Sequence, residues 1–269
     1  MSGTVFAPQI LKNKVAFVTG GGSGINLSIA HRFAENGASV VLLGRSAERL
    51  EKAAEGLRSQ GATVRTFSAD VRDFGAVDAA MQETAKAMGA IDILVCGAAG
   101  NFPAPAVGLS SNGFRAVVDI DLVGTFHAAR AAFEHFRKPG ATMLAISAPQ
   151  AYLPTPMQAH VCAAKAGVDM LVQTLAYEWG GAGVRVNSLV PGPIDDTEGM
   201  RRLAPTPEGR DAVVSAIPLG RMGSKDEVAD AALFLCSDAA RFVTGTVLRC
   251  DGGQSLGGSA AFLRGMGLV

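Results

Sequence analysis

The chain has 269 residues, 48% of them hydrophobic, and its formal net charge is +0 with a sequence pI of about 6.9. This balance excludes the basic footprint of a nucleic-acid binder. Mean hydropathy is +0.26, yet no apolar run reaches the roughly 18 residues that a membrane span needs. Residues 1–14 lack the charged start and long apolar stretch of a signal peptide. We therefore expect a cytoplasmic protein without a nucleic-acid partner or a membrane span.

Short apolar runs alternate with helix-length amphipathic segments along the whole chain. Strands are predicted over residues 15–19, 39–43, 63–68, 91–96, 142–147, 185–190 and 247–250. They are mostly continuous and rich in β-branched residues, as in strands buried on both faces. Helices are predicted over 25–36, 47–60, 76–88, 112–136, 159–179 and 225–235, the last opened by a capping box of Ser224 and Glu227. This alternation predicts an α/β fold, a Rossmann-type doubly wound parallel sheet of about seven strands, in a single domain over 1–269.

Cysteine spacing gives no sign of a metal site. The four cysteines are Cys96, Cys162, Cys236 and Cys250, and none of them has Cys-x-x-Cys spacing. Cys96 and Cys250 end strand-like runs and are predicted to be small buried hydrophobes.

A glycine-rich segment follows the first predicted strand and opens the first predicted helix. Residues 17–26 read Phe-Val-Thr-Gly-Gly-Gly-Ser-Gly-Ile-Asn. Glycines let the backbone approach a pyrophosphate, and the helix N-terminus offers free N–H groups. A lone glycine-rich turn is a weak signal, but this one has the strand–turn–helix context that the motif requires. We expect a dinucleotide cofactor to contact Gly20, Gly22, Ser23, Gly24 and Ile25.

The end of the second strand predicts which dinucleotide binds. Enzymes that use NAD place Asp or Glu about 20 residues after the glycines, to bind the ribose 2′-hydroxyl. Here Arg45 and Ser46 stand where that acid is missing. A guanidinium suits a 2′-phosphate, which favours NADPH, whereas a merely solvated Arg45 leaves the missing acid unexplained. Asp70 and Val71, after the third strand, are placed to contact the adenine.

With these features the chain resembles the short-chain dehydrogenase/reductase family over essentially its whole length. The resembling segments are residues 19–25, 97–100, 191–194 with Thr197, and 251–253. The resemblance implies that the Pro-Gly segment holds the nicotinamide carboxamide and that Thr197 meets the pyrophosphate. The further cofactor contacts that it implies are Ala98, Gly100, Lys165, Pro191, Gly192, Ile194 and Thr197. Asn26 departs from the pattern, which has a third glycine for helix–sheet packing, so we expect a slightly shifted helix with binding retained.

The usual catalytic set of this family, Asn, Ser, Tyr and Lys, is largely missing. Counted from Lys165, the Tyr position is Val161, the Ser position is Ala148 and the Asn position is Asp121. In the intact site the phenol protonates the forming alkoxide and the Ser orients the carbonyl. General acid catalysis contributes roughly 100- to 10,000-fold, so a simple ketone suits this site poorly. The chain is then either a non-catalytic binder or a reductase whose substrate takes its proton elsewhere.

A closer resemblance favours the second alternative. Ala-Ala-Gly-Asn-Phe at 98–102, Asp-Ile-Asp at 119–121, and His160 before Val161 are similar to the NADPH-dependent 2,4-dienoyl-CoA reductases, especially the peroxisomal type. That branch also lacks the Tyr and carries Asp at the Asn position. The resemblance implies that Asp121 positions or relays a proton through water and that Lys165 holds the nicotinamide ribose. The alternative for Asp121 is a buried structural acid paired with Lys165.

The same resemblance implies an acyl-CoA site. It puts the CoA moiety on Arg45, Arg72 and Arg202, and the acyl thioester on Phe102, Ser110, Ser111 and Asn112. Asn101, Gln150 and His160 complete the expected substrate contacts, with Gln150 at the position of a Tyr in the mitochondrial branch. His160 also fits helix packing, and Arg72 and Arg202 also fit plain surface charges. The family is usually homotetrameric, with helices 112–136 and 159–179 at the main interface.

The sequence therefore predicts an NADPH-dependent oxidoreductase that converts 2,4-dienoyl-CoA to 3-enoyl-CoA in the β-oxidation of unsaturated fatty acids. One alternative is another acyl-thioester or carbonyl reductase of the family, against which Val161 and Ala148 argue. The other is a non-catalytic NADP-binding protein, against which the retained Lys165 and Asp121 argue. Residues 265–269 do not form a peroxisomal address, which favours the cytoplasm.

Overall fold

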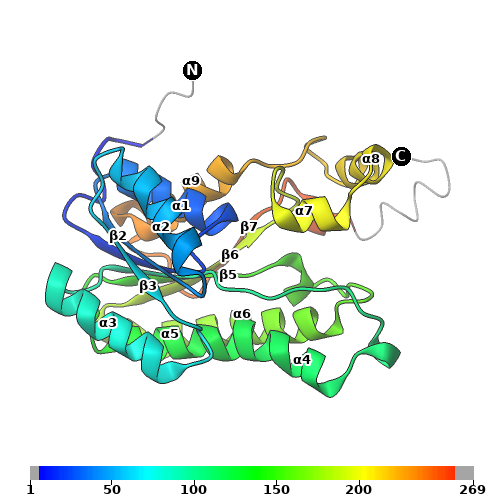
Figure 1. Ribbon diagram of the computed structural model, residues 1–269. Helices are drawn as coiled ribbons and strands as arrows, with labels where there is room; N and C mark the ends of the chain where they lie inside the picture. Colours follow the sequence, from blue (N-terminus) through cyan, green and yellow to red (C-terminus); the bar gives the residue numbers. More distant parts are fainter. Residues whose placement is uncertain (1–5, 258–269) are drawn as a thin grey trace.

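Seven parallel strands form one sheet through the centre of the molecule (Figure 1). The computed structural model describes residues 6–257. The strands are β1 (Val15–Thr19), β2 (Ser39–Gly44), β3 (Val64–Ser68), β4 (Ile93–Cys96), β5 (Thr142–Ile146), β6 (Arg185–Pro191) and β7 (Val247–Cys250). Their order is β3-β2-β1-β4-β5-β6-β7, so the winding reverses between β1 and β4. The predicted doubly wound sheet is confirmed; the two ends of the predicted 1–269 domain lie outside the described residues.

Helices cover both faces of this sheet. On one face pack α1 (Gly24–Glu35), α2 (Ala47–Arg58) and α9 (Lys225–Cys236); on the other pack α3 (Phe74–Met88), α5 (Gly124–Phe133) and α6 (Ala159–Trp179) (Figure 1). Every residue of β1 and β4 is buried, because strands between two helix layers have no solvent face. The capping box of α9 is formed: Ser224 Oγ accepts from the Glu227 N–H at 3.2 Å, and Glu227 Oε2 accepts from the Ser224 N–H at 2.8 Å.

The segment predicted as one helix over 112–136 is interrupted. Helix α4 (Ser111–Val118) is joined to α5 by a single π-helical turn, Asp119–Val123. Such turns occur inside α-helices and often at functional sites. This turn contains Asp121, the predicted catalytic carboxylate, which is only 1% exposed.

Two short helices between β6 and α9 are absent from the prediction. They are α7 (Glu198–Leu203) and α8 (Pro207–Ser215) (Figure 1). Each begins at a threonine N-cap: Thr197 Oγ1 accepts from the Met200 N–H and Thr206 Oγ1 from the Gly209 N–H, both at 3.2 Å. Across residues 6–257, no helix is long and apolar enough to cross a membrane.

The cysteines are structural rather than reactive groups where they are fully buried. Burial raises the pKa of Cys96 and of Cys236 to about 12, so both remain thiols. Cys250 is half-buried and thus less enclosed than predicted. Within the described part of the chain, no cluster of three or more His, Cys, Asp or Glu could hold a metal ion.

Candidate active site

A cavity of about 720 Å³ opens at the carboxyl ends of the strands. Doubly wound sheets bind their ligands at this edge, near the point where the strand order reverses. The residues predicted for the cofactor that line it are Gly20, Gly22, Ser23, Gly24, Ile25, Arg45, Ser46, Asp70, Val71, Ala98 and Thr197. Five other predicted cofactor residues, Gly100, Lys165, Pro191, Gly192 and Ile194, lie outside this lining.

The glycine-rich turn depends on its glycines and is open on one side. Gly20 and Gly24 have φ angles of +67° and +63°, in the left-handed region that favours glycine. A Cβ at Gly20 would lie 2.9 Å from the backbone of Ala98. At Gly24 a Cβ would meet nothing within 4 Å, so this side of the turn is open. The first N–H groups of α1 can therefore bind phosphate oxygens.

Opposite charges meet where β2 and β3 end. Arg45 is exposed and lines the cavity, and among residues 6–257 no carboxylate forms an ion pair with it. Arg72 is instead held by Asp70, to which its Nε and Nη2 donate at 3.0 and 2.7 Å. This hydrogen bonding holds the pKa of Asp70 below its usual value. Arg49 also lines the cavity, but sequence reasoning missed it. It lies in the first turn of α2, four residues after Arg45, and this spacing could have predicted a second arginine beside the cofactor.

Asp121 and Lys165 form a buried ion pair. Asp121 Oδ2 lies 3.1 Å from Lys165 Nζ, with the two side chains 1% and 8% exposed. Asp121 Oδ1 accepts a 2.7 Å hydrogen bond from the Gly100 N–H, and Lys165 Nζ donates to the Ile146 carbonyl at 3.0 Å. The pairing that we gave as the structural alternative for Asp121 is therefore present. It also joins the turn after β4, the π turn, the end of β5 and α6 at one point.

The position of the missing phenol is filled by packing. Val161 is 3% exposed and packs with Val117 and Ala164 in a small apolar cluster. Ala148 follows β5 and is half-buried. Neither side chain can donate a proton to a substrate oxygen.

We expect Val161→Tyr to destabilise the fold without creating a ketone reductase. The larger ring must displace its buried neighbours, and overpacking costs about 1–3 kcal/mol. Thermal unfolding should show a lower Tm, and acetoacetyl-CoA should remain unreduced. Val107→Tyr is the matched control, because Val107 is 99% exposed and its Tm should not change. A stable Val161→Tyr variant that reduces the ketone would contradict this account.

Phe102 and His160, both predicted for the substrate, lie against each other. Their ring centroids are 4.6 Å apart in an edge-on arrangement. His160 is fully buried, and neither ring nitrogen has a hydrogen-bond partner among the described residues. Phe102 is 39% exposed. Its ring lies close to the start of α4: a Cβ added to Gly113 would be 3.2 Å from the Cζ atom of Phe102.

The other predicted substrate residues lie beside Phe102 in the sequence, at the start of α4, and at Gln150 before α6. Ser110 is the N-cap of α4 and accepts from the Gly113 N–H at 3.1 Å. Asn101, Ser111 and Asn112 are exposed. Gln150 donates from Nε2 to Gln158 Oε1 at 2.8 Å.

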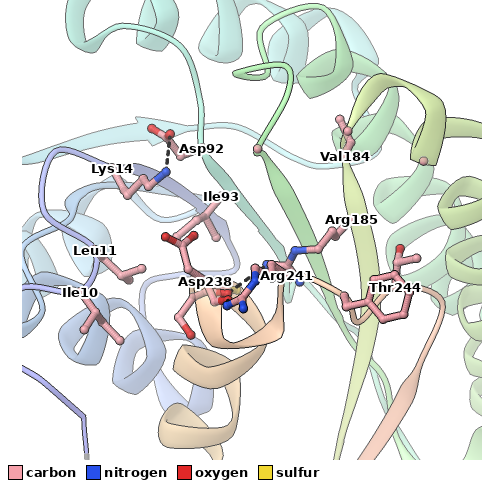
Figure 2. Close-up of a pocket in the computed structure, with 16 residues that line it drawn as sticks. Ile10, Leu11, Lys14, Asp92, Ile93, Val184, Arg185, Asp238, Arg241 and Thr244 are labelled. Atoms are coloured by element: carbon pink, nitrogen blue, oxygen red, sulfur yellow. Dashed lines mark hydrogen bonds and ion pairs between the residues drawn. The ribbon is translucent and has the colours of Figure 1, made fainter.

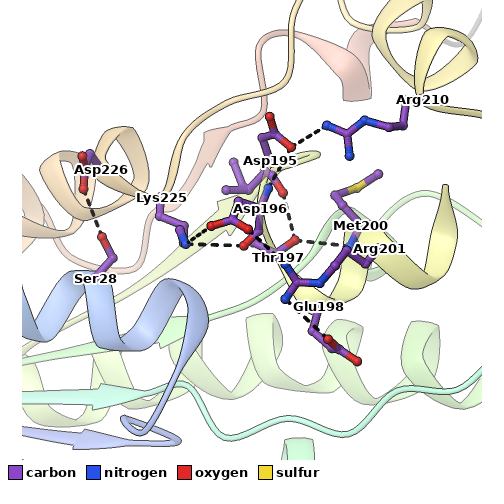
Figure 3. Close-up of polar contacts among 11 residues, drawn as sticks. Ser28, Asp195, Asp196, Thr197, Glu198, Met200, Arg201, Arg210, Lys225 and Asp226 are labelled. Atoms are coloured by element: carbon purple, nitrogen blue, oxygen red, sulfur yellow. Dashed lines mark hydrogen bonds and ion pairs between the residues drawn. The ribbon is translucent and has the colours of Figure 1, made fainter. Parts of the chain in front are cut away.

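Arg202, predicted for CoA, lies on α7 in a network of exposed ion pairs. Its Nε donates to Glu198 Oε1 at 2.9 Å. Figure 3 shows the adjoining pairs, which tie the start of α7 to α8 and α9: Asp196 with Arg201 at 3.0 Å and with Lys225 at 2.9 Å, and Asp195 with Arg210 at 2.6 Å. Exposed pairs of this kind contribute little to stability, because solvent screens the two charges. Arg202 can therefore exchange Glu198 for a phosphate at little cost.

The Pro-Gly segment at the end of β6 packs tightly against the Asp-Gly-Gly turn. The Gly192 N–H donates to the Cys250 carbonyl at 3.0 Å, and a Cβ on Gly192 would lie 2.5 Å from Asp251 Cα. Thr197 Oγ1 donates to the Ile194 carbonyl at 2.8 Å. Two segments that the sequence singled out separately thus form one unit.

A second cavity of about 400 Å³ lies at the amino ends of the strands (Figure 2). One of its buried polar groups is Asp92, which accepts from the Val15 N–H at 2.9 Å and pairs with Lys14 at 3.5 Å and Arg137 at 2.6 Å. Because these charges satisfy one another and the cavity is at the wrong end of the sheet for a nucleotide, we place the active site in the larger cavity.

The fold and the site define an oxidoreductase, and the chain belongs to the short-chain dehydrogenase/reductase family. A family profile described as enoyl-(acyl carrier protein) reductase matches residues 20–255. The peroxisomal 2,4-dienoyl-CoA reductase of Pongo abelii, named as (3E)-enoyl-CoA-producing, is 46% identical over 254 residues, which cover 94% of this chain and 87% of that protein. The probable 2,4-dienoyl-CoA reductase of Bacillus subtilis (strain 168), named as (2E)-enoyl-CoA-producing, is 38% identical, with 91% and 98% covered. Among solved structures, a gluconate 5-dehydrogenase from Burkholderia cenocepacia J2315 in complex with NADP and tartrate is 33% identical with a TM-score of 0.87, covering 92% of this chain and 98% of that one.

Proposed function

We propose that this chain is an NADPH-dependent 2,4-dienoyl-CoA reductase that forms 3-enoyl-CoA during the β-oxidation of unsaturated fatty acids. The observation that carries the proposal is a site with an intact Asp121–Lys165 pair and a packed valine where the phenol of a carbonyl reductase would stand. The relatives named as dienoyl-CoA reductases support the same conclusion.

A conjugated thioester explains why no phenol is needed. Bound NADPH would supply a hydride, and in a dienoyl thioester the acceptor is the δ carbon, far from the oxygen. Negative charge then moves through the diene to the thioester oxygen, and a proton is added at the α carbon. The protein has to stabilise that oxygen and guide a proton, which are tasks for positioned donors and a carboxylate.

Lys165 and Asp121 suit these tasks. An ammonium has three N–H donors; one binds the Ile146 carbonyl, and the charge lies 3.1 Å from Asp121 Oδ2, so a donor remains for the nicotinamide ribose. Asp121 is fixed by the Gly100 N–H and can position a water that delivers the proton. The neighbouring His160 and Phe102 are proposed to contact the acyl thioester.

Arginines at the rim supply the charge that phosphates need. Arg45 is proposed to bind the 2′-phosphate of NADPH and, with Arg72 and Arg202, the CoA moiety. Arg72 and Arg202 each have a carboxylate partner in the structure, Asp70 and Glu198, and a phosphate would replace that partner. Guanidinium groups pair with either anion in the same bidentate geometry.

The test is a side-by-side assay of NADPH oxidation with 2,4-hexadienoyl-CoA and acetoacetyl-CoA. We expect turnover of the diene alone and a product with its double bond at position 3, assigned by NMR. A double bond at position 2, the outcome in the name of the Bacillus relative, would keep the enzyme class and overturn the product. Turnover of the ketone alone would overturn the proposal.

The alternative from another class is a non-catalytic NADP-binding protein. The fluorescence of bound NADPH distinguishes it from a dienoyl-CoA reductase. A dienoyl-CoA reductase should change that signal when a non-reactive acyl-CoA is added. A protein that only binds the dinucleotide should respond to NADPH and ignore the acyl-CoA.

We also propose that the chain forms a homotetramer and acts in the cytoplasm. Apolar side chains are exposed on α4, α5 and α6, including Phe114 at 39%, Phe126 at 46% and Met170 at 63%, and exposed apolar patches mark association surfaces. Light scattering on the purified chain tests the tetramer. Imaging of the tagged full chain in its own cells tests the compartment, with the peroxisomal names of several relatives as the contrasting expectation.

A further inference from the structure

Asn26 bridges two turns that line the larger cavity. It is the third residue of α1 and is half-buried. Its Nδ2 donates to the Gly97 carbonyl at 2.7 Å and to the Gly20 carbonyl at 3.3 Å. Gly20 belongs to the glycine-rich turn after β1, and Gly97 to the turn after β4, the neighbouring strand. One side chain therefore fixes the spacing between two walls of the site.

The turn after β4 is held from a second side by Thr19. Thr19 Oγ1 accepts hydrogen bonds from the N–H groups of Gly97 at 3.1 Å and Ala98 at 3.3 Å. The Asn26 amide holds the carbonyl of the same turn. Donors and acceptor of this turn are thus satisfied by two side chains from the first strand–turn–helix unit.

The Asn26 amide also occupies the space of a side chain at position 97. A Cβ on Gly97 would lie 2.2, 2.4 and 2.5 Å from Asn26 Oδ1, Cγ and Nδ2. The backbone itself does not demand glycine, because Gly97 is not among the glycines with positive φ. Withdrawal of the Asn26 side chain would break the two hydrogen bonds that its Nδ2 makes to the turns. Gly97 is therefore required because Asn26 is present.

We propose that Asn26 and Gly97 act as one size-matched pair, and that Asn26 is a positioning residue that holds the two turns at the spacing the dinucleotide needs. The part that concerns the cofactor rests on the proposed binding of NADPH in this cavity. The pair explains how the chain dispenses with the third glycine of its family's pattern. Because asparagine replaces that glycine at position 26, position 97 must be glycine.

A double-mutant cycle tests the pair. Gly97→Ala alone should lower the Tm and weaken NADPH binding about tenfold or more, within the coupling range of contacting residues. Asn26→Gly should weaken NADPH binding several-fold, because both hydrogen bonds are lost. In the Asn26→Gly background, Gly97→Ala should change the NADPH Kd by less than about threefold. NADPH fluorescence gives the Kd, thermal unfolding of the free protein gives the Tm, and a raised KM for NADPH with unchanged kcat at saturation marks a positioning role.

Gly140→Ala is the matched control. Gly140 lies at the amino edge of the sheet with φ +114° and nothing within 4 Å of its Cβ position. Strain should lower the Tm of this variant, leave the Kd for NADPH unchanged, and not be relieved by Asn26→Gly. Equal effects of Gly97→Ala in both backgrounds, or no effect in either, would overturn the proposed pair. If the unmodified chain fails to bind NADPH, the proposed cofactor falls, while the Tm values of the free proteins still decide the pair.

Discussion

Lys165→Ala is expected to reduce turnover of 2,4-hexadienoyl-CoA by about 100-fold or more, because a small misplacement of the reacting groups is enough to lower a rate by that factor. The variant loses the donor proposed for the nicotinamide ribose and leaves Asp121 as an unpaired buried carboxylate. Breaking a buried pair in this way costs about 3–5 kcal/mol, so the Tm should fall as well. Steady-state rates and thermal unfolding of the same preparations measure both effects.

Asp121→Asn separates catalysis from packing. The amide oxygen can still accept the 2.7 Å hydrogen bond from the Gly100 N–H, but the negative charge is gone. If Asp121 guides a proton, kcat should fall about 100-fold while the Kd for NADPH stays within about twofold. A drop in Tm with normal kcat would assign Asp121 a purely structural role. Lys225→Ala, which removes an exposed partner of Asp196, is the control and should leave kcat unchanged.

Arg45→Ala is expected to weaken NADPH binding about 10- to 100-fold and to leave NADH binding nearly unchanged. A charge-assisted hydrogen bond contributes about 1.5–3 kcal/mol, and only the phosphorylated ribose can accept it from this guanidinium. The Kd values of both dinucleotides, measured by fluorescence, give the ratio directly.

Arg58→Ala controls for a simple loss of positive charge on α2, because the Arg58 guanidinium is paired with Glu51. It should preserve the preference for NADPH. Equal loss of both dinucleotides in Arg45→Ala would contradict the selector role. Unchanged binding of both would move that role to Arg49, which lines the same cavity.

The sheet could be predicted because each strand has a recognisable local sequence pattern. Buried β-branched runs separated by helix-length segments have few other solutions. Helices α7 and α8 escaped because they are short and show no apolar stripe; their only signals are the caps Thr197 and Thr206. The π turn at Asp119–Val123 escaped because a continuous helical pattern does not reveal one extra residue in a turn.

Site residues could be predicted where the spacing of a motif places them. Contacts that only the tertiary fold creates could not be predicted. Counting from Lys165 located Asp121, and the structure brings the two within 3.1 Å. The contact of Asn26 with Gly97 spans 71 positions and joins two residues that nothing in the sequence associates with each other. The Phe102–His160 contact likewise depends on how the loop that carries Phe102 packs against the start of α6.

The packing around Val161 has a consequence for redesign of this site. A tyrosine placed at that position would meet Val117 and Ala164 in a small apolar cluster. A designer who wants ketone chemistry here would therefore have to make room between α4 and α6 before adding the phenol, because overpacking a buried position is destabilising by itself.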